Sequence, residues 1–291
     1  MTTESLNTRT KYAIFTIDAE DFGDTGCIKQ SGADMSGHRM LDGLDTYIAL
    51  LEKHGAKATV FTVCNTARAV ADKLKSYASR GHEIALHGLE HINPAELSDE
   101  EFSRSVSEAK REIEDELGVK IVGYRAPFFG LDGAKLEIIK NAGFLYDSSR
   151  LDVSKHHASG HIALEGFKKI TEGIWKSGSF FEFGIPAQSI FGLFKFPISG
   201  GGYVRLGNWG FVKTAIKRFI GHSDYYVFYL HPFELSKEKV LIPEGLRGLD
   251  KYYLSHGFDN FEKRIEIIIT LLEKAGFEFT TFAELMKKNE N

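Results

Sequence analysis

Residues 12–21 read YAIFTIDAED, an apolar run that ends in three carboxylates, those of Asp18, Glu20 and Asp21. The run predicts a buried β-strand over 12–17, because its apolar residues are continuous and rich in aromatic and β-branched side chains. Similar runs recur as ATVFTV at 58–63 and YYVFYL at 225–230, and segments with helical periodicity separate them. Continuous apolar strands that alternate with helices are typical of a parallel sheet covered on both faces, so we predict an α/β fold.

The other predicted elements extend this alternation along the chain. A capping box, Ser98-x-x-Glu101, predicts the start of a long helix that stops before Gly118. The remaining strands are expected at 82–86, 120–124, 144–146 and 278–281, and the helices at 40–54, 66–80, 98–117, 133–141, 209–220 and 260–275. The rhythm breaks between about 151 and 210, where Gly, Phe and Ser are frequent. We therefore predict a single domain over 1–291 with a substrate-shaping insertion at about 151–210.

Composition and charge narrow the class of protein. The formal net charge is −4 and no basic cluster is present, so a nucleic-acid partner is not expected. No apolar stretch reaches the roughly 20 residues that a membrane-spanning helix needs. The first twelve residues lack the apolar segment of a signal peptide, and Cys27 and Cys64 are too isolated for a disulfide framework. We expect a cytoplasmic protein without a transmembrane segment.

Charged side chains follow several of the predicted strands. Parallel strands place their carboxyl ends at one edge of a sheet, where α/β enzymes collect their functional groups. The carboxylates at 18–21 follow the first strand, and their burial is costly unless they bind a cation or serve as a base. His87 and His91 follow the strand at 82–86, and on a helical turn this i, i+4 spacing points two imidazoles at one metal ion. Taken alone, the carboxylates could form a solvated turn, and each histidine could be an ordinary core or surface residue.

Three more strands end in a reactive group. Arg125 follows the strand at 120–124, either as a surface residue or as the partner of a carboxylate in the acidic cluster. Asp147 follows the strand at 144–146, as a site carboxylate or as a helix cap, and His231 follows the strand at 225–230. Each residue is ambiguous alone, but their placement after different strands predicts one active site at a single edge of the sheet.

The order and local sequence of these residues resemble the polysaccharide deacetylase superfamily, which has the NodB homology domain and includes carbohydrate esterase family 4. The branch most similar to this chain is linked to surface-glycan and exopolysaccharide biosynthesis. The matching segments are TIDAEDF at 16–22, HGLEH at 87–91, GYRAPFF at 123–129, YDSS at 146–149, GGGYVRL at 200–206 and FYLHPFE at 228–234. The resemblance implies an irregular (β/α)7 barrel with one bound divalent metal ion, commonly zinc.

The resemblance also assigns roles near the metal. His87 and His91 match the metal-binding histidines, and Asp18 looks like the general base. The carboxylate ligand should be Glu20 or Asp21, and both stay open because this sequence departs from the usual pattern of two adjacent aspartates followed by glycine.

Other catalytic roles come from the same resemblance. Arg125 matches the arginine that orients the base, and His231 matches the general acid. Asp147 falls where some members place a carboxylate that tunes this histidine, and Glu234 is a rival for that role.

Substrate contacts are expected from two of the matching segments. Pro127 and Phe128 belong to the first, and Gly201 and Tyr203 belong to the second. The glycine run at 200–202 permits unusual backbone angles and close approach to a ligand. Aromatic rings that could stack on sugars, or simply pack in the core, are those of Trp175, Phe180, Phe181 and Tyr203. We interpret His156, His157 and His161 as a solvated loop, because no carboxylate or strand accompanies them.

The implied reaction is hydrolysis of an N-acyl group, typically acetyl, on an amino sugar or glycan intermediate, with metal-activated water attacking the amide carbonyl. The expected partner is an N-acylated sugar, a nucleotide sugar or a lipid-linked glycan, and the last would bring the chain to a membrane as a peripheral protein.

Two alternative functions stay open. One is a small-amide or ureide hydrolase on the same fold, similar to allantoinases. The other is a carbohydrate-binding relative that has lost catalysis.

Overall fold

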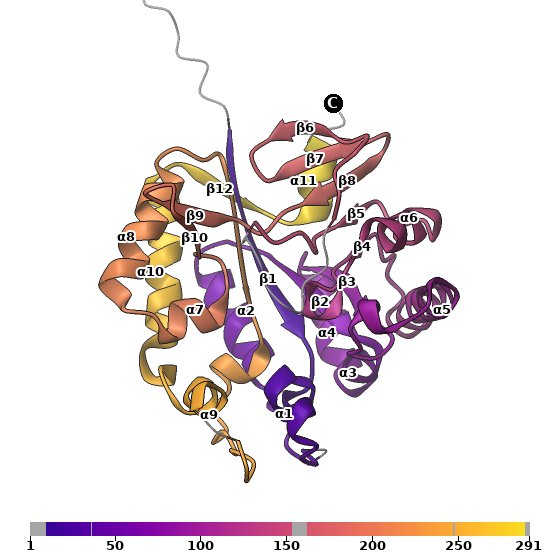
Figure 1. The fold of residues 1–291 in the computed structure, drawn as a ribbon, viewed down its shortest axis with the longest axis horizontal. Helices are drawn as coiled ribbons and strands as arrows, with labels where there is room; N and C mark the ends of the chain where they lie inside the picture. The colour runs from indigo at the N-terminus through magenta and orange to yellow at the C-terminus, as the bar shows by residue number, and fades with distance from the viewer. Residues whose placement is uncertain (1–9, 36, 153–161, 247, 289–291) are drawn as a thin grey trace, which may run out of the picture.

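The computed structural model describes residues 10–35, 37–152, 162–246 and 248–288. A curled β-sheet forms its centre, and helices pack around the sheet (Figure 1). The strands lie in the order β11 (Tyr225–Leu230), β1 (Lys11–Ala19), β2 (Ala58–Val63), β3 (Glu83–Gly88), β4 (Gly123–Tyr124), β5 (Tyr146–Asp147), β8 (Phe180–Phe183), β7 (Ile174–Ser177) and β6 (Lys168–Thr171). Neighbouring strands from β11 to β8 are parallel, whereas β7 and β6 pair antiparallel.

The central strand β1 has three partners. One of its edges pairs with β11, and the other is shared by β12 (Phe277–Thr280) along its first half and by β2 along its second half. Successive side chains of a strand point to opposite faces. Phe15 and Ile17 enter the core beneath the outer helices, whereas Ile14 enters a second core inside the curl. Asp18 shares the inner face with Ile14, so the end of β1 presents its carboxylate to the inside of the curl.

Helices supply the rest of both cores. The outer core is built by α2 (Gly43–Lys53), α4 (Ala71–Ser79), α5 (Asp99–Leu117), α6 (Gly133–Asn141), α8 (Trp209–Ile220) and α10 (Phe261–Lys274). The inner core is completed by α11 (Phe282–Lys288). The predicted capping box of α5 is confirmed, because Ser98 Oγ accepts from the Glu101 N–H and the Glu101 carboxylate accepts from the Ser98 N–H. The helix predicted over 66–80 is two helices, α3 (Cys64–Ala69) and α4, separated at Val70.

The segment 151–210 combines sheet and cavity wall. Its strand β8 joins β5 in the main sheet, and β9 (Ala187–Ile190) and β10 (Phe194–Pro197) form a separate antiparallel hairpin. The hairpin lies beside α8 (Figure 1). The short helix α7 (Gly201–Leu206) follows it. The histidines at 156, 157 and 161 lie outside the described residues.

Three of the aromatic rings considered for sugar stacking pack against other side chains of the protein. Phe180 and Phe181 are buried in the two cores. Trp175 packs beneath the guanidinium of Arg150, whose Cζ lies 5.1 Å from the ring centre. Along the described residues, no helix is both long enough and apolar enough to cross a membrane.

Candidate active site

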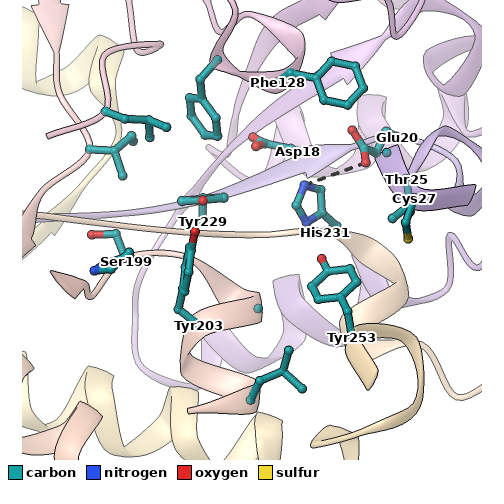
Figure 2. Close-up of a pocket in the computed structure, with 18 of the residues that line it drawn as sticks. Asp18, Glu20, Thr25, Cys27, Phe128, Ser199, Tyr203, Tyr229, His231 and Tyr253 are labelled. Carbon is teal, nitrogen blue, oxygen red and sulfur yellow. Dashed lines mark ion pairs between the residues drawn. The ribbon is translucent and has the colours of Figure 1, made fainter. Parts of the chain in front are cut away.

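A cavity of about 630 Å³ opens where β1, β3 and β11 end. Asp18 and Glu20 face it from the end of β1, and His231 faces it from the end of β11 (Figure 2). Polar groups therefore collect in one part of the cavity, as expected for the carboxyl edge of a parallel sheet. The apolar part of the lining is formed by Leu151, Ile185, Pro186, Phe196, Pro197 and Leu206.

Glu20, His87 and His91 form a compact ligand set. One side-chain donor atom from each lies within 4.8 Å of the others, and all three side chains are buried. Glu20 Oε2 is 2.6 Å from His91 Nε2 and 3.7 Å from His87 Nε2. Burial alone would raise the pKa of the Glu20 carboxyl, but His91 and His231 outweigh burial and hold that pKa well below its usual range.

The two histidines meet by a route that differs from the predicted helical turn. His87 lies in β3, and His91 follows in an irregular bend. Gly88 connects them with a φ of 119°, which side chains with a Cβ rarely adopt, and an added Cβ would lie 2.9 Å from the Glu90 carbonyl. The prediction of helical i, i+4 geometry is therefore wrong, although the two rings do come together, with centroids 5.3 Å apart.

The ligand set fits a divalent cation. His87 Nδ1 lies 2.8 Å from the backbone carbonyl of Arg125, which can only accept, so this nitrogen donates and Nε2 is the nitrogen directed at Glu20. Glu20 Oε2 is buried, and it faces the Nε2 atoms of both histidines. One carboxylate oxygen and two imidazole nitrogens form a donor set common for zinc.

Asp21 is not part of this set. Its carboxylate pairs with Arg39 at 2.8 Å and accepts a hydrogen bond from Thr66 Oγ1 at 3.2 Å. Of the two carboxylates left open by the sequence, the structure brings Glu20 to the histidines. The reason is the tight turn after β1, in which the Glu20 N–H bonds to the Asp18 carbonyl and the next residue points away.

Asp18 is held by a buried arginine. Arg125 Nη1 donates to Asp18 Oδ1 at 2.7 Å and to Thr16 Oγ1 at 2.8 Å. The rest of the guanidinium donates to the carbonyl and hydroxyl of Ser148, both at 3.1 Å, and the Phe61 ring lies 4.1 Å from Cζ. Both charged groups are almost fully buried, so their mutual pairing is what makes their burial tolerable. The prediction that Arg125 pairs with a carboxylate of the acidic cluster is confirmed, and that carboxylate belongs to Asp18.

His231 begins a buried chain of charges. Its Nδ1 lies 3.5 Å from Glu234 Oε2, and Glu234 Oε1 accepts from Arg205 Nε at 3.1 Å. Arg205 also donates to the carbonyls of Tyr253 and His256 and lies 4.2 Å from the Phe258 ring centre. Burial disfavours the imidazolium, but Glu20 and Glu234 outweigh burial and raise the pKa of His231 to about 9. Arg205 was missed by sequence reasoning, although it lies in the quoted segment 200–206.

Asp147 lies apart from this chain, which corrects its predicted role beside His231. It accepts hydrogen bonds from the N–H and hydroxyl of Ser149 and is the register partner of Glu182 on β8. The carboxylate against His231 is Glu234, because the single 3₁₀ turn after β11 folds it back onto the histidine.

The predicted substrate contacts divide into two groups. Phe128 and Tyr203 line the cavity, and Phe128 has a φ of 56° that brings its ring to 4.6 Å from His91. Pro127 instead lines a neighbouring hollow. Gly201 packs against Glu234, and a Cβ there would lie 2.3 Å from Glu234 Oε2. The expected unusual backbone angles are absent at 200–202, because Gly200 is extended and the next two glycines begin α7.

Comparisons with known proteins agree with this geometry. Residues 39–146 match the sequence model of the family described as "Polysaccharide deacetylase". The sequence of residues 39–146 is thus that of a polysaccharide deacetylase domain. Residues 149–287 match a family described as a domain of unknown function, DUF3473. The boundary between the two matches falls just after β5.

Individual relatives are distant from this chain in sequence. A peptidoglycan deacetylase of Helicobacter pylori is 26% identical over 107 residues, which cover 37% of this chain and 36% of that protein, so the alignment spans about a third of the relative. A putative polysaccharide deacetylase structure from Mycobacterium smegmatis has a TM-score of 0.63 at 18% identity, covering 98% of this chain and 92% of that one. The Puue allantoinase structure has a TM-score of 0.63 at 14% identity, covering 95% and 89%. The predicted α/β fold of the irregular (β/α)7 type is confirmed.

Proposed function

We propose that this chain is a metal-dependent hydrolase that removes an N-acyl group, such as acetyl, from an amino sugar within a glycan or glycan precursor. The observation that carries the proposal is the placement of Glu20, His87 and His91 in the same cavity as Asp18 and His231. A metal ligand set, a base held by an arginine and a histidine paired with a carboxylate are the groups that amide hydrolysis requires.

Glu20, His87 and His91 would hold the cation. A bound divalent metal would supply Lewis acidity toward the amide carbonyl and toward the attacking water. Zinc is the metal that we propose, because one carboxylate and two imidazoles suit it.

Asp18 is the group that we assign as the base. Arg125 Nη1 donates to this carboxylate at 2.7 Å and restricts its rotation. The carboxylate accepts the proton of the attacking water as the new carbon–oxygen bond forms. A neutral side chain at this position could not do so.

His231 is the group that we assign as the acid. Its raised pKa keeps the imidazolium present near neutral pH, and 23% of its side chain stays accessible from the cavity. It donates its proton to the leaving nitrogen as the carbon–nitrogen bond breaks, and Glu234 stabilises the charged form until that step.

The cavity wall supports a sugar ring as the substrate. Phe128, Tyr203, Tyr229 and Tyr253 all line the cavity. Their ring faces and hydroxyl groups suit the mixed apolar and polar surface of a pyranose. We propose an acetylated glycan, a nucleotide sugar or a lipid-linked glycan as the substrate class. The cytoplasmic location expected from the sequence stays a prediction.

The first experiment measures bound metal and amine release together. We expect about one divalent ion per chain, and amine release from N-acetyl amino sugars. Both should be lost in the His87→Ala, His91→Ala double variant and in Glu20→Gln. Asp21→Asn is the matched control, because Asp21 is the adjacent carboxylate but lies outside the ligand set, so metal and activity should be retained.

Other results would replace the proposal. Absence of metal in wild-type protein after reconstitution with zinc would favour a carbohydrate-binding relative without catalysis. Metal-dependent cleavage of a ureide, with no cleavage of any N-acyl sugar in the panel, would favour an allantoinase-like hydrolase. The fold does not separate these functions, because both kinds of enzyme share it.

A further inference from the structure

The β9–β10 hairpin has an exposed apolar tip. Phe191 and Leu193 are each 83% exposed, and Phe194 is 53% exposed. These side chains are close together in the chain, with one glycine among them. Scattered exposed apolar residues are ordinary, but a contiguous group at the end of a hairpin indicates an interaction surface.

The residues at the turn of this hairpin differ from those usual in a water-exposed turn. The Leu193 N–H bonds to the Ile190 carbonyl, and the two residues between them, Phe191 and Gly192, have φ values of 50° and 71°. Turns with two positive φ values favour Asn-Gly or Asp-Gly, whose polar side chain is hydrated. A phenylalanine in the first of these positions is strained and holds a large apolar ring outward.

The hairpin belongs to a basic part of an acidic chain. Residues 183–223 contain five lysines and arginines and no aspartate or glutamate. Since the whole chain has a formal net charge of −4, the remainder carries −9. Arg205 is neutralised by Glu234 and Lys195 pairs with Asp152. The other basic residues of the stretch all lie on α8, and they are Lys213, Lys217 and Arg218.

The hairpin that carries the apolar tip lies against the basic helix α8. Phe196 of β10 packs edge-on against Phe211 of α8, with ring centroids 5.0 Å apart, and Phe211 is itself exposed. Figure 1 shows the hairpin beside α8 at one side of the molecule. Phe211 and Arg218 are seven residues apart and share one face of the helix.

We propose that the hairpin tip and α8 form a peripheral membrane-binding surface whose occupant is an anionic lipid bilayer. Aromatic and aliphatic side chains partition into the boundary between headgroups and acyl chains, and nearby lysines and arginines bind anionic headgroups. A soluble polyanion would use the positive charges alone and would leave Phe191 and Leu193 in water. The same hairpin lines the catalytic cavity through Phe196 and Pro197, so docking would place the cavity beside the headgroups. A cavity beside the headgroups favours a lipid-linked glycan as the substrate, and this step rests on the proposed function. The membrane contact itself does not rest on the proposed function.

Vesicle binding tests the proposal on the full chain, without substrate. Wild-type protein should co-sediment with vesicles that mix phosphatidylcholine and phosphatidylglycerol, and more weakly with phosphatidylcholine alone. The Phe191→Ser, Leu193→Ser double variant should lose about tenfold or more of its partition coefficient. Lys217→Glu, Arg218→Glu should lose a comparable factor on the anionic vesicles.

Two matched controls should bind like wild type. Leu249→Ser changes a residue that is 85% exposed but lies on α9 (Gly248–Ser255), away from the hairpin. Arg104→Glu, Lys120→Glu reverses the same amount of charge on and after α5. Amine release from a soluble sugar should be unchanged in the double serine variant, so loss of membrane binding and loss of catalysis are separable.

Three outcomes would overturn the proposal. Wild-type protein could fail to bind the anionic vesicles. Leu249→Ser could reduce binding as much as the hairpin variant does. Finally, a concentration-dependent dimer that the hairpin variant abolishes, without vesicle binding by wild type, would show that a second copy of the chain covers this surface.

Discussion

Asp18 and Glu20 are two residues apart, yet their surroundings give them different chemistry. Asp18 points to the inner face of the sheet and pairs with Arg125. An arginine is always positively charged, so Asp18 has a counter-charge without any metal ion. Glu20 follows the end of the strand and faces His87 and His91. One carboxylate is therefore paired with a side chain of the protein itself, and the other is available to a cation.

Asp18→Asn should separate these two roles. Asparagine keeps the shape and the contact with Arg125 but cannot accept a proton at neutral pH, so the rate should fall about 10²–10⁴-fold. Metal content should not change, because Glu20 and the histidines are intact. The free energy of unfolding should fall by about 3–5 kcal/mol, since Arg125 loses its counter-charge. Amine release, metal analysis and thermal unfolding measure the three effects, and a fully active variant would contradict the assignment.

Glu234→Gln should move the alkaline limb of the pH–activity profile. His231 acts as an acid only while protonated, so its contribution is present below its pKa, which is about 9, and is lost above it. Removing the charge 3.5 Å away lowers that pKa, and the limb should shift to lower pH by about one unit. A cation at Glu20 would lower the starting value in both proteins but would leave the direction of the shift unchanged.

The pH profile of kcat measures this shift. Because Glu234→Gln leaves Arg205 buried without a counter-ion, a second variant that combines Arg205→Met with Glu234→Gln guards against unfolding. The assignment fails if both variants fold and keep the wild-type alkaline limb.

At the scale of elements, α7 begins at Gly201, where the surrounding atoms leave no room for a side chain. Gly201 is the first residue of this helix and lies against Glu234 and Leu230. A Cβ would come within 2.3 Å of Glu234 Oε2, in the middle of the chain that joins Arg205 to His231. The close approach of α7 to the end of β11 therefore positions the histidine.

Gly201→Ala should lower kcat more than it changes KM, because it displaces Glu234 rather than the substrate. The overpacking should also cost about 1–3 kcal/mol of stability. Gly133→Ala is the control, since Gly133 likewise begins a helix, α6, but no other atom lies within 4 Å of its added Cβ. That variant should be neutral or slightly stabilised. Equal effects of the two alanines on kcat would exclude a positioning role for Gly201.

At the scale of the whole molecule, two buried carboxyl groups mark where the later part of the chain joins the sheet. Asp147 on β5 and Glu182 on β8 are register partners and both are fully buried. Burial and the charge of Asp147 raise the pKa of Glu182 well above its usual range, and burial raises the pKa of Asp147 to about 6. The pair therefore holds a proton that the unfolded chain releases.

This pair should make the protein lose stability as pH rises. Both folded pKa values lie above the unfolded values, so the contribution is favourable below about pH 4 and declines through about pH 6 and above. In Glu182→Gln the amide imitates the protonated carboxyl: Oε1 can still accept from the Arg150 N–H and Nε2 can donate to Asp147. The variant should gain about 1–3 kcal/mol over wild type near pH 8 and little near pH 4.

Chemical unfolding at several pH values measures the difference. Glu172→Gln, an exposed residue paired with Lys169, is the control and should show no such trend. A stability difference between Glu182→Gln and wild type that does not vary with pH would show that the pair carries no shared proton.

The local pattern of the sequence was sufficient for the elements with strong periodicity or marked boundaries. Helix α8 and strand β11 coincide with their predicted ranges, and the capping box marks the start of α5. The strands β4 and β5 begin later than predicted, because residues 120–122 and 144–145 at their amino ends lie outside the strands. That chemistry would gather at strand ends also followed from the sequence, since parallel strands share one edge.

The sequence by itself determined the α/β class and the set of reactive side chains, because periodicity and strand ends are local properties of the chain. Tertiary structure alone decided which of them meet. A tight turn after β1 selects Glu20 over Asp21, a glycine at positive φ brings His91 back to His87, and a 3₁₀ turn places Glu234 rather than Asp147 against His231. The roles of Arg205 and Glu182 also follow only from the tertiary structure. Their partners lie 29 and 35 residues away in the chain, and such contacts depend on packing between elements, which no local pattern encodes.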